Sequence, residues 1–250
     1  MGLGMIFGPV IGGWLGHYQL TLPFFVAGGL VLLVMPFAGF SLPESLAKPA
    51  VVETTRTAPR LNWSVLKNPL LVFFGFNLTL SFIMALFETT FALFASVKVG
   101  FGPKEMGTAF MLIGIASALV QGGLIGKLER RFGDVSLMQG GALISASGFI
   151  LLLLAPNSIL MVGASAVVMV GTALMGPTST SLVTKRNTHS QGAALGIFQS
   201  FGSLGRIFGP IIGGALYGLN IHLPYLAGAA ILVSLVLAVG PKIKSLAIKE

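Results

Sequence analysis

Long apolar segments recur along this chain, and several approach or exceed twenty residues without a charged side chain. A helix needs about 20 such residues to cross the hydrocarbon core of a bilayer. Only 9% of the 250 residues are charged and 54% are hydrophobic, whereas roughly a quarter of the residues in a soluble domain are charged. A membrane β-barrel would instead alternate apolar and polar residues within short segments. The sequence therefore predicts an all-α integral membrane protein.

The apolar segments divide into eight predicted transmembrane helices. Their ranges are 1–16, 20–42, 69–97, 106–126, 135–155, 158–182, 192–217 and 222–240. The segment 43–68 contains Pro43, Pro49 and Pro59 with mixed charge and no apolar period, so we expect a cytoplasmic linker there. This linker separates two helices in 1–42 from a six-helix bundle in 69–240, and 241–250 is expected to form a cytoplasmic tail.

Basic side chains are unevenly divided between the two sides of the predicted helices. The connections on one side carry only Lys98 and Lys104. The other side carries Lys48, Arg56, Arg60, Lys67, Lys127, Arg130, Arg131, Lys185, Arg186, Lys242, Lys244 and Lys249. Cytoplasmic loops hold the Lys and Arg excess, so this pattern predicts a multi-pass protein with both termini in the cytoplasm. The net charge of +8 then reflects membrane topology, and we expect no nucleic-acid partner.

The pattern G-x-x-x-G-P-x-x-G-G occurs twice, at 4–13 and at 205–214, with an offset of 201 residues. The segments that follow, 22–28 and 223–229, match in the same register, which indicates an internal duplication. The same offset places the start of the first unit about 130 residues before this chain, so we expect a parent of about twelve spans whose first four are missing here. The pattern residues are Gly4, Gly8, Pro9, Gly12, Gly13, Gly205, Gly209, Pro210, Gly213 and Gly214.

Three motifs resemble the major facilitator superfamily, and within it the proton-coupled drug antiporters. The pattern at 4–13 is similar to the antiporter signature of the fifth span, and Leu42-Pro43-Glu44-Ser45 is similar to the end of the sixth, especially in tetracycline-type exporters. The turn containing Gly126, Glu129, Arg130, Arg131 and Gly133 resembles the family's cytoplasmic loop motif. It departs from that motif with Glu129 in place of the usual Asp and Asp134 in place of a basic residue.

The resemblance implies that the eight helices are spans 5–12 of a twelve-helix fold. It further implies alternating access and proton-driven efflux of small amphiphilic compounds across a bacterial inner membrane. Such a protein is not an enzyme, uses the proton gradient without a cofactor, and has the lipid bilayer and a small-molecule substrate as partners. The alternatives are an importer or symporter of the same fold, or a non-transporting truncated remnant. The missing spans would come from the full-length parent.

Glu88 is the only acidic residue inside a predicted span. Asn77 and Ser81 precede it at helical spacing, so the three residues share one face. A carboxyl group in a low-dielectric cavity suits proton exchange and the recognition of cations. The alternatives are a carboxylate near the outer headgroups or one paired structurally, for instance with Arg206.

Arg206 lies about midway along its predicted span, where an unpaired charge is costly. It is a candidate for substrate binding or proton coupling, and Gln199, seven residues earlier, should share its face. Equally, Arg206 could cap carbonyl groups freed by Pro210 or pair within the bundle. No metal-ligand cluster, phosphate loop or nucleophile–base pair is evident in the sequence.

The glycine–proline patterns and the 126–134 turn each allow two interpretations. Glycines four residues apart share a helix face, which can form a hinge and interdomain seal or simply pack closely against a neighbour. The charges of Glu129, Arg130 and Arg131 can form a latch that changes during transport, or can serve only to set the topology.

Overall fold

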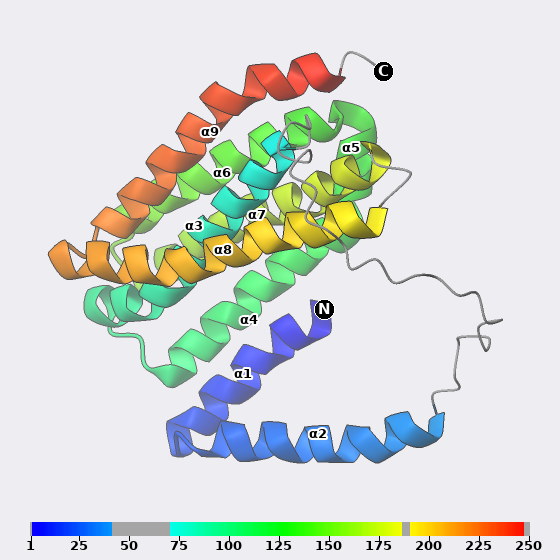
Figure 1. The fold of residues 1–250 in the computed structure, drawn as a ribbon. Helices are drawn as coiled ribbons and strands as arrows, with labels where there is room; N and C mark the ends of the chain where they lie inside the picture. The colour runs from blue at the N-terminus through cyan, green and yellow to red at the C-terminus, as the bar shows by residue number, and fades with distance from the viewer. Residues whose placement is uncertain (1, 42–70, 187–190, 248–250) are drawn as a thin grey trace.

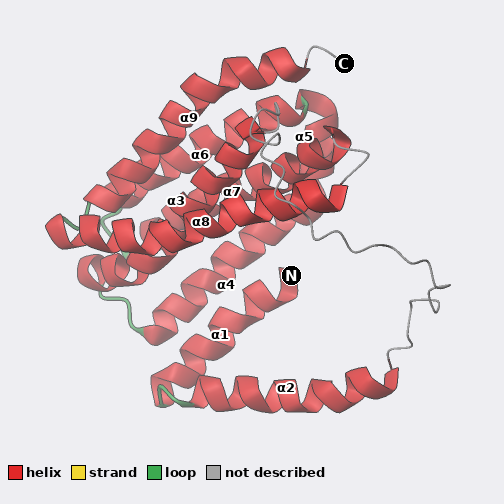
Figure 2. Cartoon of the chain, viewed as in Figure 1, coloured by secondary structure: helices red, strands yellow, loops and turns green. Residues whose placement is uncertain are grey.

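A computed structural model describes residues 2–41, 71–186 and 191–247. These ranges are helical with no β-strand, which confirms the all-α fold (Figure 2). The helices are α1 (Gly2–Tyr18), α2 (Leu22–Ser41), α3 (Leu71–Val99), α4 (Pro103–Leu119), α5 (Ile125–Phe132), α6 (Asp134–Leu154), α7 (Ser158–Arg186), α8 (Gln191–Leu219) and α9 (Leu223–Ala247). A π-helical turn, η2 (Val120–Leu124), joins α4 to α5. The eight predicted helices are thus present, whereas the predicted linker at 43–68 lies outside the described residues.

Five of these helical segments are long and apolar enough to cross a membrane, as judged over the described residues. They are α2, α3, the continuous α4–η2–α5 segment, α6 and α7. Helix α1 has 17 residues, and the described apolar part of α9 covers only Leu223–Ala238. The composition of the helices therefore agrees with a multi-pass membrane protein.

The helices associate mainly in pairs. Helix α3 packs along α8, α6 packs along α7, and α9 covers α6 and part of α3. Helix α4 packs against both α7 and α1. Helices α1 and α2 lie on the outer side of the assembly (Figure 1). The described part of the chain therefore consists of a bundle of α3–α9 with the α1–α2 hairpin attached through α4.

Two helix ends differ most from the sequence predictions. The segment 127–134 was predicted to be a turn, but α5 continues to Phe132 and only Gly133 breaks the helix, with a φ of +75°. Since this φ lies in the left-handed region, a glycine is needed there. Helix α9 continues to Ala247, beyond the predicted end at 240. The end of an apolar segment thus marks these helix ends poorly, because the backbone hydrogen bonds continue into polar residues.

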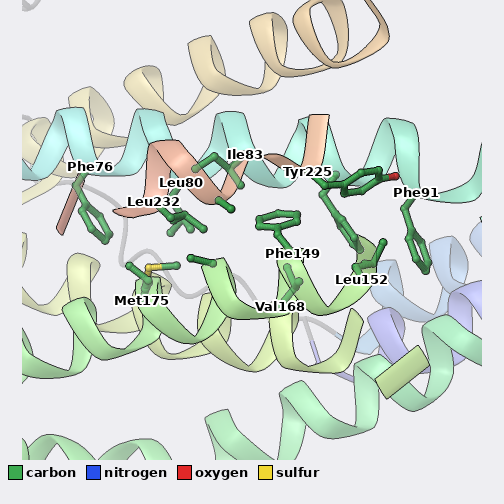
Figure 3. Close-up of a cluster of buried hydrophobic side chains, with 14 of the residues drawn as sticks. Phe76, Leu80, Ile83, Phe91, Phe149, Leu152, Val168, Met175, Tyr225 and Leu232 are labelled. Carbon is green, nitrogen blue, oxygen red and sulfur yellow. The ribbon is translucent and has the colours of Figure 1, made fainter. Parts of the chain in front are cut away.

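Aromatic side chains fill the interior of the bundle. Six phenylalanines of α3 are buried: Phe73, Phe74, Phe76, Phe87, Phe91 and Phe94. At the centre, Phe149 of α6 meets Phe87 edge-on at 5.9 Å between ring centroids and lies beside Tyr225 of α9 (Figure 3). Lipid is as apolar as these rings, so close packing rather than exclusion of water holds the helices together.

Glycines allow the second helix pair to approach closely. A methyl group added at Gly141 of α6 would lie 2.6 Å from the Gly171 carbonyl oxygen of α7. Next to this contact, the Ser145 hydroxyl donates a hydrogen bond to the Val168 carbonyl oxygen at 2.8 Å. Small residues and hydroxyl groups commonly join helices inside membranes in this way.

Candidate functional site

Asn77 joins α3 to α8. Its Nδ2 donates a hydrogen bond to the Phe198 carbonyl oxygen at 2.7 Å, and the side chain is half-buried. Interhelical hydrogen bonds of this kind contribute about 0.6 kcal/mol on average in a membrane protein. Because α3 is continuous from Leu71 to Val99, its helical spacing places Asn77, Ser81 and Glu88 along one face. One member of this predicted polar face therefore has a structural partner on the neighbouring helix.

Glu88 on α3 and Arg206 on α8 are exposed side chains on two helices that pack directly together. Arg206 lies near enough for its positive charge to act on the Glu88 carboxylate. Among the described residues, neither side chain has a hydrogen-bond partner or an ion pair within 4.0 Å. Charged groups within membrane helices usually face a bundle interior or a water-filled cavity. Both side chains therefore lie exposed on the surface of the described helices.

Gln199 and Ser203 extend this polar surface along α8. Both are exposed and precede Arg206 at helical spacing, so the three residues share a face as predicted for Gln199 and Arg206. The Ser203 hydroxyl donates to the main-chain carbonyl oxygen of Gln199 at 3.0 Å, and the Gln199 side-chain amide has no hydrogen-bond partner among the described residues. The candidate site thus combines one carboxylate, one guanidinium and one amide on adjacent helices.

The second glycine–proline pattern brings α8 against α3. A methyl group added at Gly209 would lie 2.6 Å from the Phe82 carbonyl oxygen and 2.8 Å from the Ala85 Cβ. Gly205 and Gly213 make similarly close approaches to α3, whereas the space around Gly214 is open. This seam positions Arg206 next to α3, because Arg206 directly follows one of the glycines in the contact.

The first pattern makes a single close contact, between α1 and α4. A methyl group added at Gly13 would lie 2.6 Å from the Pro103 carbonyl oxygen and 2.7 Å from the Gly107 Cα. From the α1 side, the Pro9 carbonyl oxygen would lie 2.8 Å from a methyl group added at Gly107 of α4. The other glycines of this copy have nothing within 4 Å of an added Cβ: Gly4, Gly8 and Gly12. The contact joins the predicted N-terminal unit to the six-helix bundle.

The cytoplasmic loop motif is mostly helical. The Thr178 hydroxyl of α7 donates to the Leu174 carbonyl oxygen at 2.7 Å, and Oε1 of Glu129 on α5 lies 3.4 Å from the same hydroxyl. The Arg130 Nε donates to the Gly126 carbonyl oxygen at 3.0 Å. The Arg131 guanidinium lies 5.5 Å from the ring centroid of the neighbouring Phe132. Glu129 therefore connects the motif to α7, while the two arginines make contacts within α5.

Sequence reasoning missed two features of α4. The first is the π-helical turn η2, for which adjacent Gly122 and Gly123 were the only available signal. The second is a cation–π contact between α4 and α1, in which the Lys104 Nζ lies 4.8 Å from the Trp14 ring centroid. A pair 90 residues apart leaves no local pattern in the sequence. Neither feature belongs to the polar surface of α3 and α8.

The described residues show no group of three or more His, Cys, Asp or Glu side chains that could hold a metal ion. Glu88 and Arg206 lie on separate helices, α3 and α8.

Comparison with known proteins gives a consistent family assignment. The sequence profile of the Major Facilitator Superfamily matches residues 1–185 and 122–245. Multidrug resistance protein 2 of Bacillus subtilis (strain 168) is 30% identical over 247 residues, covering 93% of this chain and 60% of the relative. Multidrug resistance protein 1 of the same strain is 32% identical over 244 residues, covering 96% of this chain and 61% of the relative.

A further relative comes from another bacterium. Quinolone resistance protein NorA of Staphylococcus aureus (strain COL) is 30% identical over 254 residues, covering 99% of this chain and 64% of the relative. The chain thus spans about three fifths of the length of these curated relatives.

Proposed function

Because this chain belongs to the Major Facilitator Superfamily, we propose that it acts in proton-coupled export of small amphiphilic compounds by alternating access. The relatives named for multidrug and quinolone resistance support this choice of substrate class. The observation that carries the proposal is the exposed, unpartnered pair of charges formed by Glu88 of α3 and Arg206 of α8.

Glu88 has the chemistry of a coupling residue in this scheme. As a carboxylate it attracts the cationic part of an amphiphile, and as a neutral acid it releases that cation. A proton and a cationic substrate then compete for the same group, which couples export to the proton gradient. Arg206 places a guanidinium group on the adjacent helix α8, where it can bind an anionic part of a solute. Gln199 supplies an additional donor and acceptor on the same surface.

The proposal includes the membrane in which the protein lies and its orientation there. The twelve basic residues on one side of the helices support a bacterial inner membrane with both termini in the cytoplasm. Glu129, Arg130 and Arg131 then lie at the cytoplasmic surface, where the contact between Glu129 and Thr178 could open and close with the transport cycle. The energy source is the proton gradient, with no further cofactor.

Replacing Glu88 tests the coupling role. We expect Glu88→Gln to abolish ethidium accumulation driven by a proton gradient in inside-out membrane vesicles, because the amide cannot exchange a proton. Glu105→Gln is the matched control: Glu105 is exposed at the start of α4, and glutamine keeps an acceptor for the Gly102 N–H. The readout is ethidium fluorescence after acidification of the vesicle interior.

The same assay separates the alternatives. Gradient-driven accumulation inside these vesicles indicates export, whereas gradient-driven loss of preloaded dye indicates import. Unchanged, pH-dependent accumulation by Glu88→Gln would contradict the role of Glu88. A complete absence of gradient-driven movement in the unmodified protein would contradict the proposed export itself.

A further inference from the structure

Helices α3 and α8 run side by side in the same direction (Figure 1). The glycines of α8 fix their register. A methyl group added at Gly205 would collide with Leu78 and Phe82 of α3. One added at Gly213 would instead meet Leu86, further along α3. Later glycines of α8 thus meet later residues of α3, and this register shows which residues of the two helices lie level with each other.

The register separates the two charges of the candidate site along the helix axes. Arg206 directly follows Gly205, whereas Glu88 lies just beyond the level of Gly213. Since Gly213 comes seven residues after Arg206, the two charged residues are displaced by about 10 Å or more at 1.5 Å per residue. Among the described residues, neither side chain forms an ion pair within 4.0 Å. The charges are therefore too far apart to neutralise each other directly.

Both charges lie on the same side of the contact between α3 and α8. Helical spacing places Arg206 beside the glycine face of α8, on the side also occupied by Gln199 and Ser203. It places Glu88 beside the residues of α3 that meet those glycines. Because the helices are parallel, these two positions project to one side. The effect of the Arg206 charge on the Glu88 carboxylate agrees with this placement.

The surface of α8 between the two charges is low and apolar. Ile207 is exposed, and Pro210 is half-buried. Around Gly214 the space is open, because an added Cβ would meet nothing within 4 Å. The apolar body of a solute can therefore lie along this part of α8 between Arg206 and Glu88.

The two charges have different effects on different solutes. A guanidinium binds a carboxylate through two parallel N–H donors, and the Glu88 carboxylate attracts a cationic group. A solute with a positive charge alone would pair with Glu88, but Arg206 would repel it and would stay unpaired. An unpaired charge within a membrane helix is costly, so a solute that carries both charges is favoured. Repulsion of the wrong solute contributes to specificity in the same way as attraction of the right one.

We propose that this surface prefers zwitterionic amphiphiles, with the cationic group of the solute at Glu88 and its carboxylate at Arg206. Arg206 is then the residue that determines the preference for zwitterions over cations of the same size. This inference rests on the proposed export of small amphiphilic compounds and narrows its substrate class. The apolar body of the solute would span Ile207, Pro210 and Gly214.

Two dyes that differ by one methyl ester test this preference. Rhodamine 110 carries a free carboxylate with its cationic ring system, whereas rhodamine 123 is the methyl ester of the same dye and is a cation. Fluorescence anisotropy gives the Kd of each dye for the protein in lipid nanodiscs at pH 7. We expect the unmodified protein to bind rhodamine 110 several-fold more tightly. Equal Kd values for the two dyes would overturn the preference.

Substitution of Arg206 assigns the preference to this residue. We expect Arg206→Gln to weaken binding of rhodamine 110 about tenfold, as for loss of a hydrogen bond to a charged group, without weakening binding of rhodamine 123. Arg206→Lys keeps the charge but not the two parallel donors, so its effect should be smaller; it also protects the test if Arg206→Gln does not fold. Lys104→Gln is the control, because it removes an exposed positive charge from α4 and should change neither Kd.

Two outcomes separate this inference from the proposed function. An equal effect of Arg206→Gln on both dyes, or no effect on either, would contradict the role of Arg206 even if export is observed. Binding is measured without a proton gradient, so a Kd ratio that depends on Arg206 would support the preference even if gradient-driven movement of ethidium is absent. That absence would contradict the export alone.

Discussion

The two copies of the glycine–proline pattern have the same residues at the same spacing but pack differently. In α8, Gly205, Gly209 and Gly213 form a seam with α3 that extends over about two turns. In α1, Gly13 is the one glycine of the pattern at which an added Cβ would collide with another helix, α4. The α8 contact lies within one bundle, whereas the α1 contact joins the two predicted units. The shared motif therefore gives each helix a face without bulky side chains. Whether that face makes a long contact or a short one depends on the helix packed against it.

The largest expected difference between the two copies is the loss of stability caused by substituting their central glycines, Gly209 and Gly8. Gly209→Val should lower the free energy of unfolding by about 1–3 kcal/mol, because the added atoms collide with the Phe82 carbonyl oxygen and Ala85. Gly8→Val occupies the equivalent position of α1, where an added Cβ meets nothing within 4 Å, and should have little effect. Unfolding in mixed micelles of mild and denaturing detergent measures both. An equal loss of unfolding free energy in the two variants would mean that valine destabilises the helices themselves rather than the packing between them.

A smaller effect is expected at the joint between α1 and α4. Gly13→Ala places a methyl group 2.7 Å from the Gly107 Cα, so α1 has to shift away from α4. We expect the free energy of unfolding to fall by about 1 kcal/mol or more, and the amide hydrogens at 104–110 to exchange faster. Gly12→Ala is the matched control, because its added Cβ meets open space. Faster exchange in both variants would show that the joint does not depend on close contact at Gly13.

Part of the fold and of the candidate site could be predicted from the sequence, because these features depend only on residues close together in the chain. Eight helices follow from apolar segments long enough to span a bilayer, and the face shared by Asn77, Ser81 and Glu88 follows from helical spacing alone. The repeat also indicated which residues of α8 could form a close contact. Each of these inferences needs only the residue order and the geometry of one helix.

Other features depend on which helices become neighbours. The phenylalanines of α3 cover every face of the helix, so no periodicity indicated that six of them would be buried. The hydrogen bond from Asn77 to Phe198 joins residues 121 positions apart. The predicted turn at 127–134 was wrong because a charged segment can remain helical at a membrane surface, and only Gly133 has the backbone conformation of a break. The buried phenylalanines, the Asn77–Phe198 hydrogen bond and the end of α5 all depend on tertiary packing, which the pattern of a single segment does not reveal.

The smallest expected effect concerns the residue that follows each motif. Trp14 follows the first copy and lies over Lys104, whereas Ala215 follows the second and is too small for such a contact. A cation–π contact at an exposed site contributes about 0.5–1 kcal/mol. In a double-mutant cycle with Trp14→Leu and Lys104→Gln, we expect a coupling energy within that range, since each single variant removes the same contact. Lys104→Arg keeps a cation above the ring and should retain most of the coupling. Strictly additive losses from Trp14→Leu and Lys104→Gln would show that the two side chains act independently, and the α1–α4 joint would then depend on the glycine contact alone.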